Sequence, residues 1–465
     1  AALNPHYVVH PLEGINNAVG KNVEVEFAKG CHTHKFLPSI PNELLKGGKG
    51  FEVEFYDGQE FEGSPIETRN LTGGKFWALG GFGLDIVSKS KKPSLSVRFS
   101  GTLKPEVSGE YDFEIFSIGP SKLSIDDEDL IDNWSSQEPG DTFFSMGSKP
   151  RRGQKTLESG KEYSIQVEYK WEGRFPAVQI GMLAPDDHDL MEAAVDLAKE
   201  SDATILIVGT NSDWETEGND RDSLLLPLKQ NELIEKVCAA NKNTVVVLNT
   251  GSPCEMPWND HAEAILQCWF PGQEFGNSLA DIIFGNVNPS GKLPTTFPVT
   301  LQDTPVYSTY PGKDLQMDYE EGLYIGYRWY EREKIIPLYP FGHGLSYTSF
   351  SYSDIRAIPP KGTSSVAAFE VEITNTGDVE GKEVVQCYAS VQNSKIDRPL
   401  KELKKFQKIN LAPGESKKIT FEVNERDLSY WNVETKTWQV EPAQYIFEFG
   451  SSSADIRGSA EVWLG

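Results

Sequence analysis

The apolar run Ala203-Thr-Ile-Leu-Ile-Val208 has the length of a buried strand and decides the fold of the chain around it. Upstream, apolar residues between Leu190 and Ala198 recur at helical spacing, which predicts a helix packed beside this strand. Downstream, the alternation continues in a helix over about 229–240, a strand over 244–248, an apolar run over 264–270 and a helix over about 273–284. This spacing predicts a parallel sheet with crossover helices, covered on both faces.

Period-two alternation of apolar and polar residues lies on both sides of this region. Before it, short alternating segments occur at 51–55, 94–99, 109–115, 122–125 and 163–169. After it, they return at 368–373, 383–388, 416–423 and 443–449. Many short strands between turn residues predict one β-sandwich before the parallel sheet and a second at the end of the chain. The run Asn22-Val-Glu-Val-Glu-Phe27 predicts one further strand.

The composition is that of a folded, soluble protein rich in loops. The chain has 465 residues, of which 38% are hydrophobic, with 41 Gly and 28 Pro. It is too apolar for disorder and lacks a collagen repeat. The net charge of −25 repels phosphate backbones and anionic lipid, so nucleic acid is not an expected partner. No apolar run approaches the ~20 residues of a membrane span.

The sequence leaves the compartment open between secretion and the cytoplasm. Ala1–Pro5 lack an initiator methionine and a secretion signal, so we expect that an upstream segment has been removed. The five cysteines form no disulfide framework and no zinc spacing. Triplets at Asn70-Leu-Thr72 and Asn133-Trp-Ser135 would permit glycosylation of a secreted protein.

The loop Gly209–Arg221 follows the buried strand and gathers four acidic residues, one arginine and one tryptophan. Parallel sheets bind ligands beyond the carboxyl ends of their strands, so this loop lies where a site is expected. In a partly dry crevice a carboxyl group stays protonated near neutral pH, as a general acid must. The composition alone favours a solvated acidic loop without chemistry, and the position after a buried strand brings the two interpretations closer.

Six motifs resemble, in the same order, the β-glucosidases of glycoside hydrolase family three. They are Trp214-Glu-Thr-Glu-Gly-Asn-Asp-Arg221, Thr250-Gly-Ser-Pro-Cys-Glu-Met-Pro-Trp258, Trp269-Phe-Pro-Gly-Gln-Glu274, Gly285-Asn-Val-Asn-Pro-Ser-Gly-Lys-Leu-Pro294, Tyr319-Glu-Glu-Gly-Leu-Tyr-Ile-Gly-Tyr-Arg-Trp329 and Tyr339-Pro-Phe-Gly-His-Gly-Leu-Ser-Tyr-Thr-Ser-Phe350. The resemblance implies an α/β sandwich domain built from residues 1–45 and 185–355.

The flanking sandwiches also resemble domains of this family. Arg398–Lys404 and Leu411–Glu415 resemble its fibronectin type III-like domain, which we expect over 356–465. Phe99–Leu103 and Gly109–Phe113 resemble the protective-antigen-type domain that some members carry as an insert, expected here over 46–184. The fold class is then multidomain α/β plus all-β: an α/β sandwich with a β-sandwich insert and a C-terminal fibronectin type III-like β-sandwich.

The resemblance assigns the general acid/base of a retaining β-glucosidase to Glu217, which precedes Gly218 in the family pattern Glu-Gly-x-Asp-Arg. Glu215, two residues earlier, is the competing candidate. Glu217 would protonate the glycosidic oxygen and later deprotonate the water that releases the sugar. Asp220 and Arg221 are expected to form an ion pair that shapes the loop.

A retaining mechanism also needs a carboxylate nucleophile, which the family places on an N-terminal (β/α)8 barrel of about 250 residues. The sequence has no such barrel, so the resemblance makes this chain the C-terminal part of a longer enzyme. The N-terminal barrel, covalently joined or as a separate chain, is its expected partner. Ser212-Asp-Trp214 mimics the triplet around the family nucleophile, but its place inside the acid/base loop favours coincidence.

In the insert, Phe143 and Phe144 are candidates for the wall of the leaving-group pocket, because sugars stack on aromatic rings. An ordinary core contact is the alternative. In calcium-binding members of the family, an Asp pair precedes the corresponding strand, whereas Asp126–Asp129 follow it here. We therefore expect these residues to form a solvated turn and no calcium site.

The remaining candidates favour structural roles. His32 and His34 alternate on one strand and lack a third ligand, which favours a surface pair over a metal site. His343 lies between two glycines and is expected to support a turn. Trp258 and Trp269 are expected in the core.

Two functions follow from these observations. In the first, the chain is the C-terminal portion of a retaining β-glucosidase that hydrolyses terminal non-reducing β-D-glucosyl residues, as in cellobiose and aryl β-glucosides. It needs no cofactor or metal and allows a homo-oligomer. In the second, the chain is a stand-alone carbohydrate-binding or interaction module in which Glu217 is idle.

Overall fold

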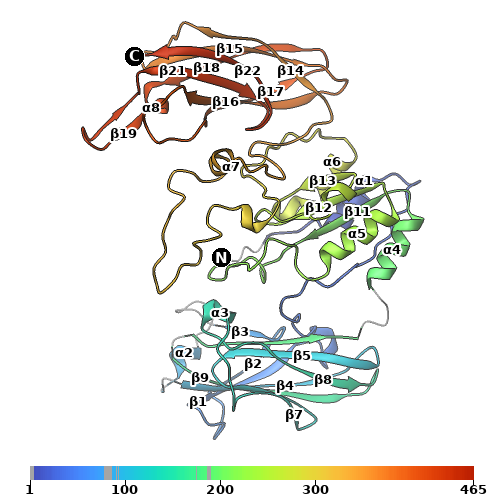
Figure 1. The fold of residues 1–465 in the computed structure, drawn as a ribbon. Helices are drawn as coiled ribbons and strands as arrows, with labels where there is room; N and C mark the ends of the chain where they lie inside the picture. Colours follow the sequence, from blue (N-terminus) through green and yellow to red (C-terminus); the bar gives the residue numbers. More distant parts are fainter. Residues whose placement is uncertain (1–4, 78–85, 91, 93, 174, 186–189) are drawn as a thin grey trace.

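The computed structural model describes the chain except for residues 1–4, 78–85, 91, 93, 174 and 186–189. Figure 1 shows a β-sandwich at one end, an α/β region in the middle and a second β-sandwich at the other end. The predicted boundary at 184–185 lies beside the undescribed residues 186–189. The expected fold class, α/β plus all-β, is confirmed.

The first sandwich consists of two antiparallel sheets. The strands are β1 Phe51–Asp57, β2 Glu67–Leu71, β3 Lys75–Trp77, β4 Ser94–Leu103, β5 Gly109–Ile118, β6 Ser121–Ile125, β7 Glu128–Asn133, β8 Arg151–Leu157, β9 Tyr163–Glu172 and β10 Ala177–Leu183, with short helices α2 Ile86–Lys89 and α3 Thr142–Ser145. One sheet has the order β2-β1-β4-β9-β6-β7 and the other β3-β10-β5-β8. Their inward residues alternate along each strand, and rings such as Phe55, Phe99 and Tyr111 fill the space between them.

The segment that enters this sandwich is paired with the segment that leaves it. The Met182 backbone N–H donates to the Pro38 carbonyl oxygen at 2.9 Å, and Ser39 forms an antiparallel bridge with Gly181. The entering and leaving segments therefore run side by side.

The middle region is the predicted parallel sheet. Its strands are β11 Thr204–Gly209, β12 Thr244–Asn249 and β13 Ala264–Gln267, in the order β11-β12-β13, and its helices are α1 Pro11–Ala18, α4 Leu190–Glu200, α5 Gln230–Ala240, α6 Phe275–Ile283 and α7 Tyr327–Glu333. Single 3-10 turns occur at Asn42–Leu44, Asn259–His261, Gly272–Glu274 and Leu301–Asp303.

Helix α5 covers one face of this sheet. Its Ile234 and Cys238 join a core cluster with Val208, Val246 and Leu248. Ile207, on the other face of β11, keeps 37% of its surface exposed. The expectation of a sheet covered on both faces is therefore wrong at β11, where part of the second face is open.

The predicted strand over Asn22–Phe27 is not formed among the residues that the structure describes. This segment belongs to no ladder or bridge, and Val23 and Phe27 are 55% and 70% exposed. The alternating pattern favours a strand, but a strand needs a neighbour to satisfy its backbone groups. The described sheets supply none.

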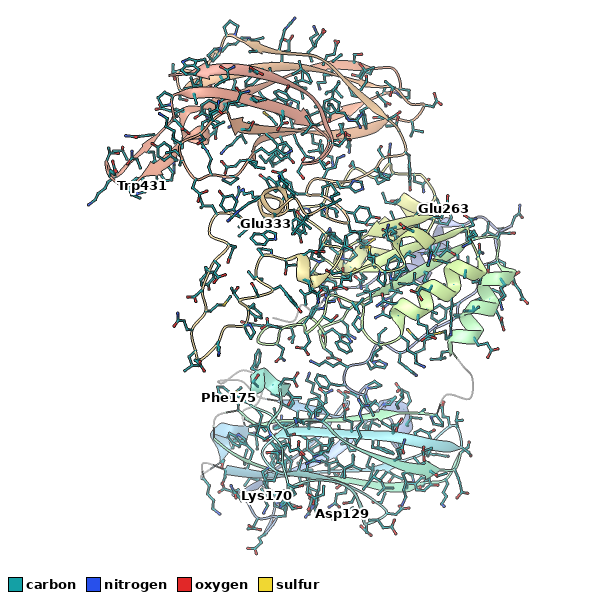
Figure 2. The ribbon with its side chains drawn as sticks, viewed as in Figure 1. Asp129, Lys170, Phe175, Glu263, Glu333 and Trp431 are labelled. Atoms are coloured by element: carbon teal, nitrogen blue, oxygen red, sulfur yellow. The ribbon has the colours of Figure 1, made fainter. Side chains whose placement is uncertain are left out.

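The terminal sandwich is the expected second β domain. Its elements are β14 Phe350–Ile358, β15 Ser365–Asn375, β16 Gly381–Val391, β17 Glu402–Leu411, β18 Ser416–Asn424, α8 Glu425–Leu428, β19 Tyr430–Asn432, β20 Thr437–Gln439, β21 Ala443–Gly450 and β22 Ile456–Leu464. Sheets β14-β15-β18 and β17-β16-β21-β22 enclose an aromatic core centred on Phe369, Phe447 and Phe449. Figure 2 shows Trp431 on the hairpin β19-β20, which projects from this domain.

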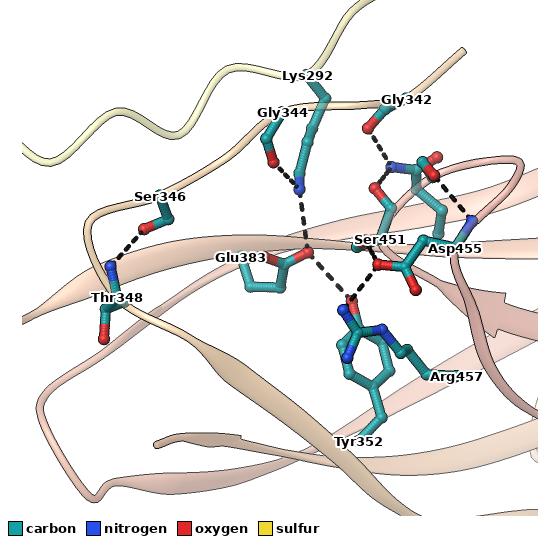
Figure 3. Close-up of polar contacts among 12 residues, drawn as sticks. Lys292, Gly342, Gly344, Ser346, Thr348, Tyr352, Glu383, Ser451, Asp455 and Arg457 are labelled. Atoms are coloured by element: carbon teal, nitrogen blue, oxygen red, sulfur yellow. Dashed lines mark hydrogen bonds and ion pairs between the residues drawn. The ribbon is translucent and has the colours of Figure 1, made fainter. Parts of the chain in front are cut away.

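A buried polar cluster joins the middle region to the terminal sandwich (Figure 3). The Lys292 ammonium donates to the Gly344 carbonyl oxygen at 2.8 Å and lies 3.4 Å from the Glu383 carboxylate, which also accepts from the Tyr352 hydroxyl at 3.1 Å. Burial raises the pKa of Glu383, and the charge of Lys292 opposes that shift. The ammonium thus compensates a carboxylate that would be costly to bury alone.

No helix among the residues that the structure describes is long and apolar enough to cross a membrane. All five cysteines fall inside the described ranges and are free thiols.

The close contact between α1 and α6 predicts that one methyl group added at Gly14 lowers the free energy of unfolding. A Cβ at Gly14 would overlap the backbone of Gly276, whereas a Cβ at Gly20 would meet nothing within 4 Å. Alanine favours a helix by ~1 kcal/mol over glycine, so Gly14→Ala would stabilise α1 if the overlap were absent. We expect instead a loss of about 1–3 kcal/mol in unfolding free energy, measured by urea denaturation. Gly20→Ala is the control, and equal midpoints for both variants would contradict the close packing.

Candidate active site

The acidic loop begins where β11 ends and is anchored to the opening segment of the chain. The Trp214 indole N–H donates to the Thr33 carbonyl oxygen at 2.8 Å, and Asn211 Nδ2 donates to the same oxygen at 3.4 Å. The side-chain oxygen of Asn211 accepts from the Asp213 backbone N–H at 2.9 Å. Trp214 therefore ties the loop to the opening segment of the chain.

Glu215 is held inside the loop by three donors. Its Oε1 accepts from the Thr210 hydroxyl at 2.7 Å, from Arg221 Nη1 at 3.3 Å and from the Ser252 hydroxyl at 3.4 Å. Only 15% of the side chain is exposed. A Cβ at Gly251 would overlap Glu215 Oε2, so glycine leaves the space that this carboxylate occupies. Glu215 is thus placed to hold the loop together.

The expected ion pair between Asp220 and Arg221 is wrong. Arg221 pairs with Glu215 and also donates to the Ser252 hydroxyl at 2.9 Å and the Leu225 carbonyl oxygen at 3.1 Å. Asp220 instead accepts from the Tyr310 hydroxyl, and this bond raises the pKa of Tyr310. The Glu215 carboxylate, the Ser252 hydroxyl and the Leu225 carbonyl oxygen together replace the water that this largely buried guanidinium gives up.

Glu217 has the opposite surroundings. Its side chain is exposed, and among the described residues no hydrogen bond or ion pair reaches its carboxylate. It lies in a tight turn closed by a bridge between Thr216 and Asn219, with Gly218 at a φ of +84° that favours glycine. The Glu217 carboxylate thus takes no part in the Glu215 cluster and is exposed to solvent.

The insert reaches this turn through the loop that contains α3. A Cβ at Gly218 would lie 3.0 Å from the ring of Phe144, which is 47% exposed. Phe143 instead packs on Phe116, with ring centroids 5.3 Å apart. The structure thus separates the predicted pair: the half-buried Phe143 packs on the buried ring of Phe116, and Phe144 lies beside the acidic loop.

The loop of Phe144 has an uncommon backbone and a charged anchor. Phe143, Phe144 and Ser145 have φ angles of 49°, 60° and 61°, a conformation that costs non-glycine residues free energy. Asp141, just before them, pairs with Lys35 at 3.1 Å. Lys35 comes from the opening segment next to Thr33, so the same stretch of chain anchors both loops.

Sequence reasoning missed several residues near the loop. Lys35 and Tyr310 lie in segments far from 209–221, and no local pattern marks them. Gly251 was noted only as part of the motif Thr250–Trp258. Asp213 was noted only as part of the acidic composition. Burial raises its pKa, and the nearby charges of Lys75, His34 and Lys35 oppose that shift.

The remaining sequence candidates have structural surroundings. The rings of His32 and His34 lie 6.0 Å apart, and burial lowers the pKa of His34. His343 stacks on Tyr339 at 5.1 Å, and Trp258 is fully buried. Trp269 is partly buried and packs against the core cluster that contains Trp258 and Val208. Asp126 and Asp127 form a turn with positive φ. Across the described part of the chain, no three His, Cys, Asp or Glu side chains are grouped as metal ligands.

The contrast between the two glutamates is testable by stability. Glu215→Gln removes a charge that three donors address, so we expect a loss of about 1–3 kcal/mol in unfolding free energy. The isosteric Glu217→Gln should change it by no more than about 0.5 kcal/mol, because the side chain is exposed. Urea titration of both variants measures the difference. A larger loss for Glu217→Gln would mean that Glu217 is the structural residue.

Comparison with known proteins identifies the architecture around this loop. The C-terminal domain of glycosyl hydrolase family 3 matches residues 1–347, and a fibronectin type III-like domain matches residues 383–453. A beta-glucosidase of Rhizobium radiobacter is 35% identical over 100% of this chain and 57% of its own length. A beta-glucosidase of Kluyveromyces marxianus is 37% identical over 98% of this chain and 56% of its own length.

Solved structures agree with these relatives. The Kluyveromyces marxianus enzyme in complex with glucose has a TM-score of 0.89 at 35% identity, covering 100% of this chain and 57% of that one. DesR, a beta-glucosidase from Streptomyces venezuelae in complex with D-glucose, has a TM-score of 0.67 at 30% identity, covering 100% and 54%. The chain thus spans little more than half the length of these relatives. It belongs to glycosyl hydrolase family 3, as the family's C-terminal domain followed by a fibronectin type III-like domain.

Proposed function

We propose that this chain is the C-terminal portion of a retaining β-glucosidase and that Glu217 is its general acid/base. The observation that carries the proposal is the exposed Glu217 carboxylate, presented by a tight turn beyond β11 and beside Phe144. The relatives named beta-glucosidases support the reaction class. The substrates are terminal non-reducing β-D-glucosyl residues, as in cellobiose and aryl β-glucosides.

The chemistry requires two carboxyl groups on opposite sides of the glycosidic bond. Protonated Glu217 gives its proton to the glycosidic oxygen as the aglycone leaves, while a nucleophile about 5–5.5 Å away bonds to the anomeric carbon. Glu217, now a carboxylate, then takes a proton from the water that releases the sugar with retained configuration. We assign the nucleophile to an N-terminal barrel domain, which this chain would meet through the face that bears Glu217.

Glu215 does not suit this role because its carboxylate is covered and already engaged. A general acid must reach the glycosidic oxygen. Arg221 and two hydroxyls donate to Glu215 Oε1, and Oε2 faces the closely packed Gly251. Glu217 is exposed and has no such donor within the described residues, so its carboxyl group is free to contact a substrate.

The insert contributes to the same site in this proposal. With domain bounds of 1–45 and 185–355 for the α/β sandwich, 46–184 for the insert and 356–465 for the terminal domain, Phe144 belongs to the insert and Glu217 to the α/β sandwich. The exposed ring of Phe144 then forms a wall for the leaving group. The strained backbone around it and the Lys35–Asp141 ion pair keep this ring at the loop.

Substitution of Glu217 in the full-length protein tests the acid/base assignment. Glu217→Gln should lower kcat/KM for cellobiose by roughly 10²–10⁴-fold, because that leaving group needs a proton. The rate of the first step, transfer of the glucosyl group to the nucleophile, should fall much less for 2,4-dinitrophenyl β-glucoside, because its aglycone leaves without protonation. Steady-state and pre-steady-state kinetics on both substrates measure the split.

Glu235→Gln, on the exposed surface of α5, is the matched control and should leave both rates unchanged. Equal loss on both substrates in Glu217→Gln would assign Glu217 a structural role. A wild-type full-length protein that binds glucosides without hydrolysing them would favour the carbohydrate-binding module instead.

Truncation of Phe144 tests the leaving-group wall. Phe144→Ala in the full-length protein should raise KM for aryl β-glucosides several-fold, since stacking contributes about 0.5–1.5 kcal/mol. Inhibition by glucose, which has no aglycone, should be unchanged. Met146→Ala is a control, because Met146 is similarly exposed in the same loop. An unchanged KM for every aglycone would remove Phe144 from the site.

A further inference from the structure

Residues 33–37 contact both the acidic loop and the insert. At one end of this segment, the Thr33 carbonyl oxygen accepts from the Trp214 indole N–H at 2.8 Å. At the other end, the Leu37 backbone N–H donates at 2.8 Å to Oε1 of Glu114 on β5, a side chain that is fully buried in the insert. These five residues therefore connect two parts of the molecule that are far apart in sequence.

Phe36 fixes the segment to the insert through ring contacts. The centroid of its ring lies 4.7 Å from that of Phe116 on β5, and the Phe116 centroid lies 5.3 Å from that of Phe143. Phe116 is buried, so this row of rings belongs to the packing of the insert. The row ends at Phe143 and leaves the exposed ring of Phe144 to be held by other contacts.

Lys35 contacts both loops through one side chain. Its ammonium lies 3.1 Å from Asp141 Oδ2 in the insert loop 140–148 and 5.9 Å from the ring centroid of Trp214 in the acidic loop. A cation within about 6 Å of an indole centroid is attracted to the ring. Only 24% of the Lys35 side chain is exposed. The ammonium is thus a shared anchor for the two loops.

The insert loop needs an anchor of this kind. Asp141 lies at the start of α3, but its side chain makes no capping hydrogen bond and reaches Lys35 instead. The left-handed backbone angles at 143–145 cost free energy, and such a conformation persists only where surrounding contacts hold it. Figure 1 shows α3 on the side of the insert that faces the middle region, where Lys35 can meet it.

The ion pair acts locally and contributes little to the stability of the whole chain. The Asp141 side chain is 54% exposed, and pairs of this kind add little to the free energy of unfolding. Loss of the Lys35 charge should therefore leave the sandwich folded. Its consequence should be a change in the position of the loop that carries Phe144.

We propose that Lys35 is a positioning residue that sets the separation between Phe144 and the turn bearing Glu217, and with it the aglycones that the site accepts. Asp141 lies three residues before Phe144, and Trp214 lies three residues before Glu217. Each contact of Lys35 is thus close to the residue that it positions. The proposal rests on the proposed function in taking the space between Phe144 and Glu217 as the aglycone side of the site.

Substitution of Lys35 in the full-length protein tests this role by kinetics. Lys35→Met keeps most of the length of the side chain and removes its charge. It should raise KM for aryl β-glucosides several-fold while kcat stays within about twofold, because Glu217 itself is unchanged. Inhibition by glucose, which has no aglycone, should not change. Lys35→Arg keeps the ion pair and the contact with the indole, so it should restore the wild-type KM.

Asp141→Ala separates the two contacts of Lys35. It removes the partner in the insert and leaves Lys35 beside the acidic loop, so it should raise KM as much as Lys35→Met does. Lys35→Met should add nothing to Phe144→Ala, because the ring that it positions is then absent. Lys155→Met is the matched control: it breaks another ion pair of the insert, 2.8 Å from Glu128, and should leave every constant unchanged.

A measurement without activity tests the position of the ring directly. We would place para-fluorophenylalanine at the site of Phe144 in the full-length protein, where its fluorine NMR signal reports the surroundings of the ring. The signal should shift in Lys35→Met and stay in place in Lys155→Met. The same shift is expected when Glu217→Gln is also present, so a failure of the acid/base assignment leaves this result intact.

Several outcomes would overturn the proposal. An unchanged fluorine signal in Lys35→Met would mean that Lys35 does not position the ring. An unchanged KM in Lys35→Met, with a raised KM in Phe144→Ala, would mean that aglycone binding does not depend on that position. A raised KM in Lys35→Met but not in Asp141→Ala would confine the effect to the acidic loop.

Two further results separate this proposal from its neighbours. A lower urea midpoint in Lys35→Met together with weaker inhibition by glucose would assign Lys35 to the fold and overturn its positioning role. A shifted fluorine signal with KM unchanged in both Lys35→Met and Phe144→Ala would support the positioning role and contradict the leaving-group wall of the proposed function.

Discussion

The arrangement of the site depends on the carboxylate of Glu215 and the donors that surround it. Thr210 comes from the end of β11, Arg221 from the far side of the loop, and Ser252 from the segment after β12. One half-buried charge therefore ties together three segments that the sheet brings to its carboxyl edge. The cluster thus fixes both ends of the turn that carries the exposed Glu217.

Much of the fold follows from patterns that are local in sequence. The parallel sheet was predictable because its strands are continuous apolar runs separated by helices at crossover spacing. The sandwiches were predictable from period-two alternation. The segment 22–27 shows the limit of this reasoning, because its pattern specifies a strand but not the neighbour that would make it one.

The site was less predictable than the fold, since its decisive contacts join distant segments. Composition leaves Glu215 and Glu217 equivalent, and the choice of Glu217 came from the family resemblance. The physical distinction between Glu215 and Glu217 comes from Gly251 and Ser252. Ser252 is 37 residues from Glu215 in sequence, and both residues lie close to Glu215 in space. Phe143 and Phe144 are likewise adjacent in sequence, but with left-handed backbone angles at both, one ring packs on Phe116 and the other is exposed. No local pattern encodes that division.

The paired segments at Pro38–Ser39 and Gly181–Met182 bear on how such a molecule changes over evolution. Since the two crossings lie against each other, removing everything between them leaves two ends that a short turn can join. The strand order of the parallel sheet would not change after such a loss, and a different domain could be inserted at the same place. The sandwich that carries Phe144 is therefore an exchangeable part, which can be lost or replaced while the acidic loop at 209–221 stays unchanged.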